Sequence, residues 1–238
     1  MKAKIGTWMS IHSHVIAELA AQCGFDWLLF DLEHGCGTEA SILPQLQAIR
    51  GTAAQAIVRV GAPHRDLIAR VLDSGAHGIM VPHVDSAAEA ESVVRASRYS
   101  PVGTRGFSRT VRANDYGLRP IESVPSPLIV AQIETLESVN RAAGIAGVDG
   151  VDVLFLGPSD LRHDIAEKRV VNVSKHGEQY EECLLRVLDA ARHAGKQAGI
   201  LIRDVAELEK HREMGFTYIA VDSDIAILRK CYLQVLGK

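Results

Sequence analysis

Eight short apolar runs recur along the chain, and they constrain its fold more than any other feature of the sequence. The runs lie at residues 5–10, 27–33, 56–60, 78–83, 128–134, 153–157, 197–202 and 218–223. Most are rich in Val, Ile and Leu and are apolar throughout, which is typical of parallel strands buried on both faces. Parallel strands need long crossover connections, so the segments between the runs are expected to contain helices.

The segments between the runs have the apolar spacing of helices. Apolar side chains recur three and four positions apart in residues 14–24, 64–75, 86–98 and 181–195. Glycines that suit a helix C-terminal cap stand at Gly24, Gly75, Gly195 and Gly215. Eight strand–helix units in 238 residues predict a single α/β domain over residues 1–238, a (β/α)8 TIM barrel. A doubly wound open sheet is the alternative, because periodicity does not show that the sheet closes.

Charge and composition argue against several classes of partner. The formal net charge is −3, and Lys and Arg are mixed evenly with Asp and Glu, so we expect no nucleic-acid partner. The N-terminus lacks the apolar core of a signal peptide, and no run approaches the roughly 18 apolar residues of a membrane helix. We therefore expect a cytoplasmic protein without a membrane partner. The four cysteines are scattered and form no Cys-x-x-Cys pair, which argues against a zinc knuckle or disulfide framework.

Acidic residues stand where the predicted strands end. Glu134 ends one run, Asp160 follows the next, and Asp31 lies near the end of the second run. In a TIM barrel these ends meet at the active-site face. Hard divalent cations such as Mg²⁺ and Mn²⁺ take oxygen ligands, and two carboxylates leave positions open for water and a chelating substrate. The sequence therefore predicts a metal-binding mouth.

Several motifs around these residues resemble those of a known family, the HpcH/HpaI class II pyruvate aldolases. The matching segments run nearly from end to end and include GTWMS, AAQCGFDWLLFDLEHG, IVRVG, GIMVPHVDSAAEAE, RYSPVGTRG, QIETLESV and VDGVDVLFLGPSDL. The resemblance implies a (β/α)8 barrel, commonly hexameric, that uses a divalent metal ion (Mg²⁺, Mn²⁺ or Co²⁺). It also implies a lyase that interconverts a 4-hydroxy-2-oxo acid with pyruvate and an aldehyde through a pyruvate enolate.

Carried onto this sequence, the resemblance implies that Glu134 and Asp160 bind the metal ion. Arg59 would donate hydrogen bonds to the keto oxygen of pyruvate as negative charge develops on it. His34, oriented by Asp31, would be the acid–base residue, since the pKa of imidazole lies near neutrality.

Two further residues complete the implied site. Gln132 and the backbone N–H of Ser159 would orient metal-bound waters and the pyruvate carboxylate.

Plainer structural roles stand beside these assignments. Glu134 and Asp160 could be helix caps or halves of salt bridges. Arg59, inside an apolar strand, needs an anionic partner and could bridge to a barrel carboxylate. Glu33 is expected to form a structural ion pair.

Other polar residues near the predicted mouth have open roles. His12, His14 and His83 either line a pocket for the aldehyde acceptor or are exposed on loops. One of Arg105, Arg109 and Arg112 either holds an anionic acceptor group or belongs to a solvated loop at a subunit interface. Residues 162–182 depart from the family pattern, which puts acceptor specificity and oligomer geometry in question.

Two other functions are kept beside the aldolase. One is a citrate-synthase-like condensation of an enolate with oxaloacetate in a siderophore pathway. The other is a catalytically silent barrel that binds an oxo acid. The complete set of Asp31, His34, Arg59, Glu134 and Asp160 argues against a silent protein.

Overall fold

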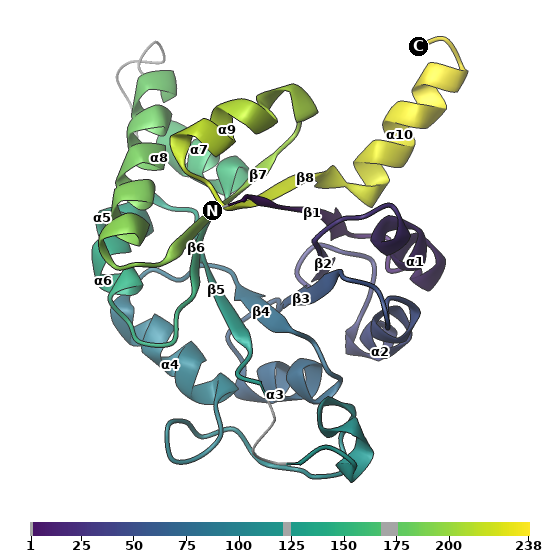
Figure 1. Ribbon diagram of the computed structural model, residues 1–238. Helices are drawn as coiled ribbons and strands as arrows, with labels where there is room; N and C mark the ends of the chain where they lie inside the picture. The colour runs from purple at the N-terminus through teal and green to yellow at the C-terminus, as the bar shows by residue number, and fades with distance from the viewer. Residues whose placement is uncertain (1, 121–124, 168–175) are drawn as a thin grey trace.

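The computed structural model describes residues 2–120, 125–167 and 176–238. In it, eight parallel strands close into a barrel in chain order, and β8 pairs with β1 (Figure 1). The strands are β1 Lys4–Met9, β2 Trp27–Asp31, β3 Gln55–Arg59, β4 Gly78–Val81, β5 Leu128–Ile133, β6 Val153–Leu156, β7 Gln197–Ile202 and β8 Tyr218–Ser223. The predicted (β/α)8 barrel is confirmed, and the doubly wound alternative is wrong because every strand has two hydrogen-bonded neighbours.

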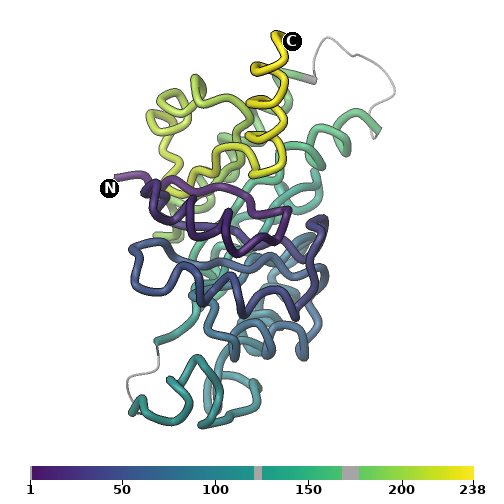
Figure 2. Tube along the Cα trace, turned by 90° about the vertical axis from the view of Figure 1, so that its right-hand side faces the viewer, coloured from purple at the N-terminus to yellow at the C-terminus, as the bar shows by residue number. Residues whose placement is uncertain are grey.

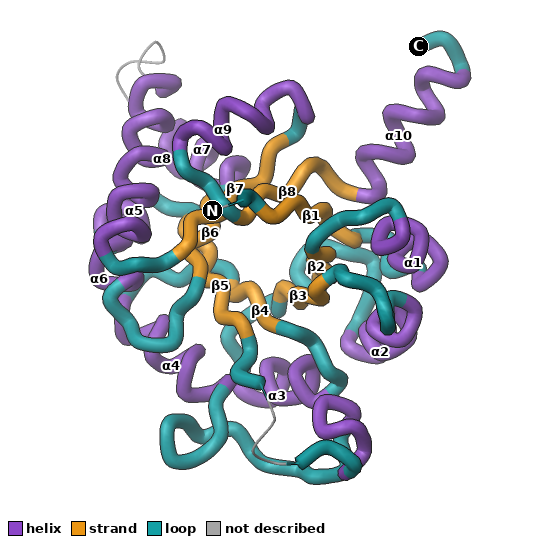
Figure 3. The backbone as a smooth tube through the Cα atoms, viewed as in Figure 1, coloured by secondary structure: helices purple, strands orange, loops and turns teal. Residues whose placement is uncertain are grey.

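Helices follow the strands and surround the barrel (Figure 3). They are α1 His14–Gln22, α2 Glu39–Ala48, α3 Arg65–Asp73, α4 Ala87–Ser97, α5 Leu136–Asn140, α6 Ala142–Ala146, α7 Pro158–Glu167, α8 His176–His193, α9 Leu208–Met214 and α10 Asp224–Val235, with short 3-10 helices η1 Arg112–Gly117 and η4 Val205–Glu207. The four predicted capping glycines all have positive φ, the left-handed conformation that ends helices. Of the divergent segment 162–182, residues 168–175 lie outside the described residues.

The barrel interior is filled by aromatic side chains. Phe155 packs against Trp8 at 5.5 Å and against Trp27 at 6.1 Å between ring centroids. Gly6 leaves room for the Trp27 ring, since a Cβ atom there would overlap it. The interior is therefore a packed plug, and a substrate can enter only at the mouths of the barrel.

The last helix, α10, departs from the usual barrel arrangement. It projects away from the barrel instead of packing along it, as Figures 1 and 2 show. Apolar side chains along it are therefore exposed, including Tyr232 at 65%, Val235 at 84% and Leu236 at 67%. No helix in the described parts of the chain is long and apolar enough to cross a membrane.

Candidate active site

A cavity of about 270 Å³ lies at the mouth formed by the C-terminal ends of the strands. Six of the seven predicted site residues line it: Asp31, His34, Arg59, Gln132, Ser159 and Asp160. The seventh, Glu134, is 2% exposed and accepts a hydrogen bond from the Gln132 side chain. The barrel thus gathers residues from positions 31 to 160 of the chain around one small space.

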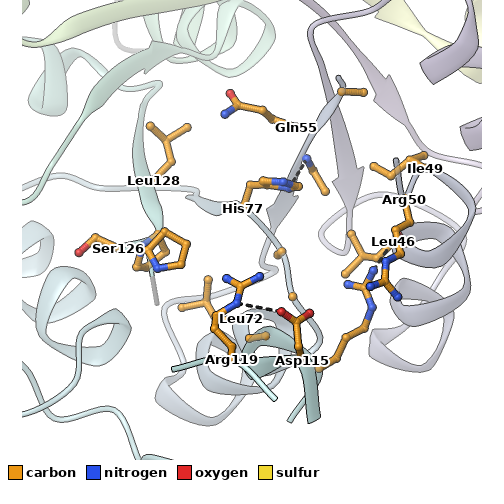
Figure 4. A pocket seen from close by; sticks show the side chains of 18 of the residues that line it. Leu46, Ile49, Arg50, Gln55, Leu72, His77, Asp115, Arg119, Ser126 and Leu128 are labelled. Atoms are coloured by element: carbon orange, nitrogen blue, oxygen red, sulfur yellow. Dashed lines mark hydrogen bonds and ion pairs between the residues drawn. The ribbon is translucent and has the colours of Figure 1, made fainter. Parts of the chain in front are cut away.

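A larger cavity, of about 820 Å³, lies at the opposite end of the barrel (Figure 4). It lies where the strands begin, beside Gln55, His77 and Leu128, and an Arg119–Asp115 ion pair stands at its edge. Active sites of TIM barrels form at the other face, where the strands end. This cavity also contains none of the predicted site residues, so the smaller one is the candidate active site.

The arginines of segment 105–117 lie on the side of the larger cavity. Arg105 and Arg112 line that cavity, and Arg109 contacts the carbonyl of Gly117 in its own segment. The prediction that one of them holds an anionic acceptor group is therefore wrong within a single chain. The cause is topological, because this segment leads into β5 and lies where that strand begins.

A buried ion pair joins the ends of β2 and β3. Arg59 donates from Nε and Nη2 to the two oxygens of Asp31 at 2.8 and 2.7 Å. Its Nη1 also lies 2.7 Å from Glu33 Oε2, so the predicted structural ion pair of Glu33 is confirmed. Burial acts to raise the pKa of Asp31, but the Arg59 guanidinium and two backbone N–H groups outweigh it and lower that pKa. Asp31 is therefore ionised at neutral pH.

His34 presents its ring to solvent at the edge of the cavity. The side chain is 68% exposed, and Nε2 lies 3.9 Å from Glu33 Oε1. Asp31 Oδ1 accepts hydrogen bonds from the backbone N–H groups of Glu33 and His34 at 3.0 and 3.3 Å. Asp31 thus holds the backbone that carries His34, whereas the ring itself makes no hydrogen bond or ion pair with Asp31.

Glu134 is held by neighbours on both of its oxygens. Oε1 accepts a hydrogen bond from the His83 backbone N–H at 2.7 Å, and the ring Nδ1 of His83 lies 3.1 Å away. Oε2 accepts one from Gln132 Nε2 at 2.5 Å. Burial raises the pKa of Glu134, the His83 N–H lowers it, and the charges of Asp160 and Glu33 raise it further.

Gly157 makes room for this arrangement. A Cβ atom at this position would lie 2.7 Å from Glu134 Oε2 and 3.0 Å from Gln132 Nε2. The motif GPSDL therefore needs its glycine for clearance, besides supplying the acidic residue that follows.

Asp160 lies in the first turn of α7 and faces the cavity. Among the described residues, its carboxylate has no hydrogen-bond or ion-pair partner. The Oε1 atom of Gln132 is buried and likewise without a partner in that part of the chain. Two nearby carboxylates and an unpaired carbonyl oxygen suit a hard cation with bound waters. In the described ranges there is no group of three or more His, Cys, Asp or Glu side chains that could hold a metal ion.

The histidines near the mouth differ in their roles. His12 is a structural brace, because Nδ1 lies 2.7 Å from Ser41 Oγ and Nε2 lies 2.8 Å from the Asp31 carbonyl oxygen. Neither role predicted for it is right. His14 is exposed at the start of α1, which confirms the alternative of an exposed histidine. His83 lies against Glu134 and is 60% exposed.

Sequence reasoning missed one basic residue of the mouth. Arg203 follows β7 directly and lines the same cavity as Arg59 and Asp160. Its position just after an apolar run was the feature that could have identified it.

Comparisons with known proteins agree with this geometry. A family model described as HpcH/HpaI aldolase/citrate lyase matches residues 4–231. A hydroxypyruvate/pyruvate aldolase from Paraburkholderia phytofirmans is 35% identical over 97% of this chain and 91% of its own length. A 5-keto-4-deoxy-D-glucarate aldolase from Klebsiella pneumoniae is 33% identical over 96% of this chain and 89% of its own.

Solved structures share the fold over nearly the whole chain. A HpcH/HpaI aldolase/citrate lyase family protein from Burkholderia cenocepacia has a TM-score of 0.91 and 32% identity, covering 99% of this chain and 94% of that one. The citrate synthase SbnG has a TM-score of 0.85 and 25% identity, covering 99% and 92%.

Proposed function

The chain belongs to the HpcH/HpaI aldolase/citrate lyase family and is a class II aldolase, a carbon–carbon lyase, and from this premise we propose its substrate and the roles of its residues. The substrate is a 4-hydroxy-2-oxo acid, which the enzyme interconverts with pyruvate and an aldehyde. One observation supports this most. The Asp160 carboxylate and the Arg59 guanidinium line one small cavity, and the Glu134 carboxylate lies beside it, bonded to the lining residue Gln132. Enolate chemistry needs both negative ligands for a cation and a donor for the developing charge.

Glu134 and Asp160 would hold the divalent metal ion. The ion, when bound, would supply Lewis-acid stabilisation of the keto oxygen. The pKa of Glu134 is raised first by burial and also by the negative charge of Asp160, and a bound cation would relieve this repulsion. The unpaired Oε1 of Gln132 would accept a hydrogen bond from a water molecule in this site. Mg²⁺, Mn²⁺ and Co²⁺ are the candidates.

Arg59 would stabilise the negative charge that develops on the keto oxygen. Its guanidinium has five N–H groups; Asp31 accepts two of them and Glu33 Oε2 lies 2.7 Å from Nη1, so two N–H groups remain for a substrate oxygen. The paired carboxylates of Asp31 and Glu33 fix the plane of the guanidinium before the substrate arrives. Such a preorganised donor contributes about 3 kcal/mol to transition-state stabilisation in oxyanion holes.

His34 and Ser159 would complete the reaction path. His34 would take the proton of the C4 hydroxyl as the C3–C4 bond breaks and its electron pair passes into the enolate. A proton delivered to C3 then gives pyruvate, and the other fragment leaves as the aldehyde. The backbone N–H of Ser159, in the unpaired first turn of α7, would bind the pyruvate carboxylate.

Pyruvate C3 proton–deuterium exchange, followed by NMR, tests this proposal without knowledge of the aldehyde. The protein is stripped of metal and then given Mg²⁺, Mn²⁺ or Co²⁺. Exchange is expected only with metal, and it should be lost in Glu134→Gln and in Asp160→Asn. The control is Glu137→Gln, which changes an exposed carboxylate on α5 that pairs with Arg141.

Two outcomes would contradict the assignment. Full exchange in both site variants would show that the metal, or the reaction, lies elsewhere. If no metal ion supports exchange, the enzyme does not form an enolate from pyruvate, and the proposed reaction is wrong.

The assembly and location expected from the sequence remain proposals. We infer a homo-oligomer, six copies by resemblance, because the exposed apolar face of α10 is a surface that a second copy would cover. Light scattering would measure the number of copies. The cytoplasmic location and the absence of nucleic-acid and membrane partners stay predictions.

The two other functions considered from the sequence are not favoured. The relatives named as aldolases are 35% and 33% identical to this chain, whereas the citrate synthase SbnG is 25% identical.

A further inference from the structure

The larger cavity, at the end of the barrel where the strands begin, has a basic wall. Its volume of about 820 Å³ lies within the range of about 300–1,000 Å³ that is usual for small-molecule sites. Among the described residues that line it, the arginines outnumber the aspartates: Arg50, Arg98, Arg105, Arg112 and Arg119 stand against Asp115 and Asp152. This part of the wall therefore has an excess of positive charge, which favours an anionic ligand.

The acidic groups near the cavity are already engaged. Asp115 pairs with Arg119 at 3.0 Å, and Asp73, beside the cavity, pairs with Arg105. Asp152 Oδ2 accepts a hydrogen bond from a backbone N–H group of β5 at 2.8 Å. In the described parts of the chain, the other three arginines of the wall therefore form no ion pair.

Arg112 is held in place with part of its guanidinium uncommitted. Nη1 donates to the carbonyl oxygen of Ser74 at 2.8 Å and Nη2 to that of Leu46 at 3.1 Å, at the C-terminal ends of α3 and α2. Gly75 leaves room for the guanidinium, since a Cβ atom there would lie 2.5 Å from Arg112 Nη1. Burial lowers the pKa of Arg112, and the positive charge of Arg50 lowers it further. Two like charges thus stand close together, and three N–H groups of Arg112 remain for a ligand.

His77 adds a donor of fixed direction to the same wall (Figure 4). Its Nδ1 accepts a hydrogen bond from the Ala56 backbone N–H at 3.0 Å, so the proton of the neutral ring lies on Nε2. Burial lowers the pKa of His77, and the charge of Arg112 lowers it further, which keeps the ring neutral at pH 7. Within the described ranges Nε2–H has no hydrogen-bond partner, and it is therefore a further donor for an anion.

We propose that this cavity binds a small phosphorylated molecule, whose phosphate group contacts Arg50, Arg112 and His77. A phosphate monoester carries nearly two negative charges at neutral pH and three acceptor oxygens, which matches two unpaired arginines and an imidazole N–H. Leucine side chains elsewhere in the wall would contact the rest of the molecule. The ligand is not the substrate of the proposed aldolase, because the aromatic plug of the barrel separates this cavity from the candidate active site.

Isothermal titration calorimetry with phenyl phosphate tests the site. Phenyl phosphate joins a phosphate group to an apolar ring, and benzyl alcohol is the uncharged comparison. The titration is made with the metal-stripped protein and again with the protein saturated with Mg²⁺ and pyruvate, which occupy the catalytic cavity. One molecule of phenyl phosphate per chain should bind with the same Kd in both cases. Inorganic phosphate should bind more weakly because it lacks the ring, and benzyl alcohol should not bind.

Two substitutions locate the phosphate group. Arg50→Gln should raise the Kd for phenyl phosphate about 10-fold, the lower end of the usual effect of losing a charge-assisted hydrogen bond, because Arg50 is exposed. Arg112→Lys keeps the charge and loses the planar fork, so it should raise the Kd less than Arg112→Gln and serve if that variant fails to fold. Arg192→Gln is the control, since this exposed arginine lies on α8, and its Kd should equal that of the wild type.

Each other outcome refutes the phosphate site. An unchanged Kd in both Arg50→Gln and Arg112→Lys would exclude these arginines as its ligands. Binding that needs Mg²⁺ and is abolished by pyruvate would place the phosphate in the catalytic cavity. Equal binding of benzyl alcohol would leave the charges without a role, and no binding of either phosphate compound would refute the site outright. None of these results bears on the aldolase, which the C3 exchange of pyruvate tests separately.

Discussion

Replacing Asp31 by Asn should destabilise the protein by about 3 kcal/mol. The Asp31 and Arg59 side chains are 2% and 7% exposed, and removal of one partner from a buried pair typically costs about 3–5 kcal/mol. The lower end applies because Glu33 remains 2.7 Å from Arg59 Nη1. Asn also keeps an oxygen that can accept from the N–H groups of Glu33 and His34. The loss of stability in Asp31→Asn therefore comes mainly from removing the negative charge that faces Arg59.

The pH dependence of this loss follows from the direction of the pKa shift. The pKa of Asp31 is lowered from 3.8, because Arg59 outweighs the effect of burial. A lowered folded-state pKa means that the pair stabilises the protein fully above the unfolded value and less as the pH falls through the folded one. The difference between wild type and Asp31→Asn should thus be constant from about pH 5 to 8 and shrink below 3.8.

Urea denaturation followed by circular dichroism, at a fixed protomer concentration, measures the difference. Glu182→Gln is the matched control, since it breaks an ion pair with Arg186 whose side chains are both more than half exposed. Its effect should stay below about 1 kcal/mol. The reasoning is refuted if Asp31→Asn costs no more than the control, or if the difference grows at low pH.

Two further substitutions probe the site. Gly157→Ala should weaken Mn²⁺ binding measured by calorimetry and cost about 1–3 kcal/mol of stability, because its Cβ would lie 2.7 Å from Glu134 Oε2. In Gly144→Ala the nearest atom would be 4.0 Å away, so equal effects in both variants would argue against a steric cause. His34→Gln should lower kcat/KM for retro-aldol cleavage about 10²- to 10⁴-fold and change the free energy of unfolding by less than about 0.5 kcal/mol. Full activity would exclude His34 as the acid–base residue.

The fold could be predicted from the sequence because the patterns that mark its strands and helices each lie within a short stretch of the chain. Continuous apolar runs identify buried parallel strands, and glycines with positive φ end the helices between them. The positions of Glu134, directly after β5, and of Asp160, in the first turn of the helix after β6, followed from the same pattern. Their separation of 26 positions along the chain is bridged by adjacent strands β5 and β6.

Features that depend on backbone irregularity or on tertiary contacts were not predictable. The shift in register between β1 and β8, which lies between Gly6 and Trp8, leaves no trace in the apolar pattern of β8. His12 has a φ of +61°, and its ring lies within hydrogen-bond distance of Asp31 at the end of β2 and of Ser41 in α2, which no local motif indicates. Helix α10 has apolar residues like those of a barrel-packed helix, so its projection from the barrel could not be read from spacing.

A crystal structure with Mn²⁺ and pyruvate, recorded with anomalous scattering from manganese, tests the central claim most directly. One anomalous peak is expected within coordination distance of a carboxylate oxygen of both Glu134 and Asp160. The keto oxygen of pyruvate should lie between that peak and the guanidinium of Arg59. A peak away from these two carboxylates, or pyruvate bound with its keto oxygen far from Arg59, would contradict the account.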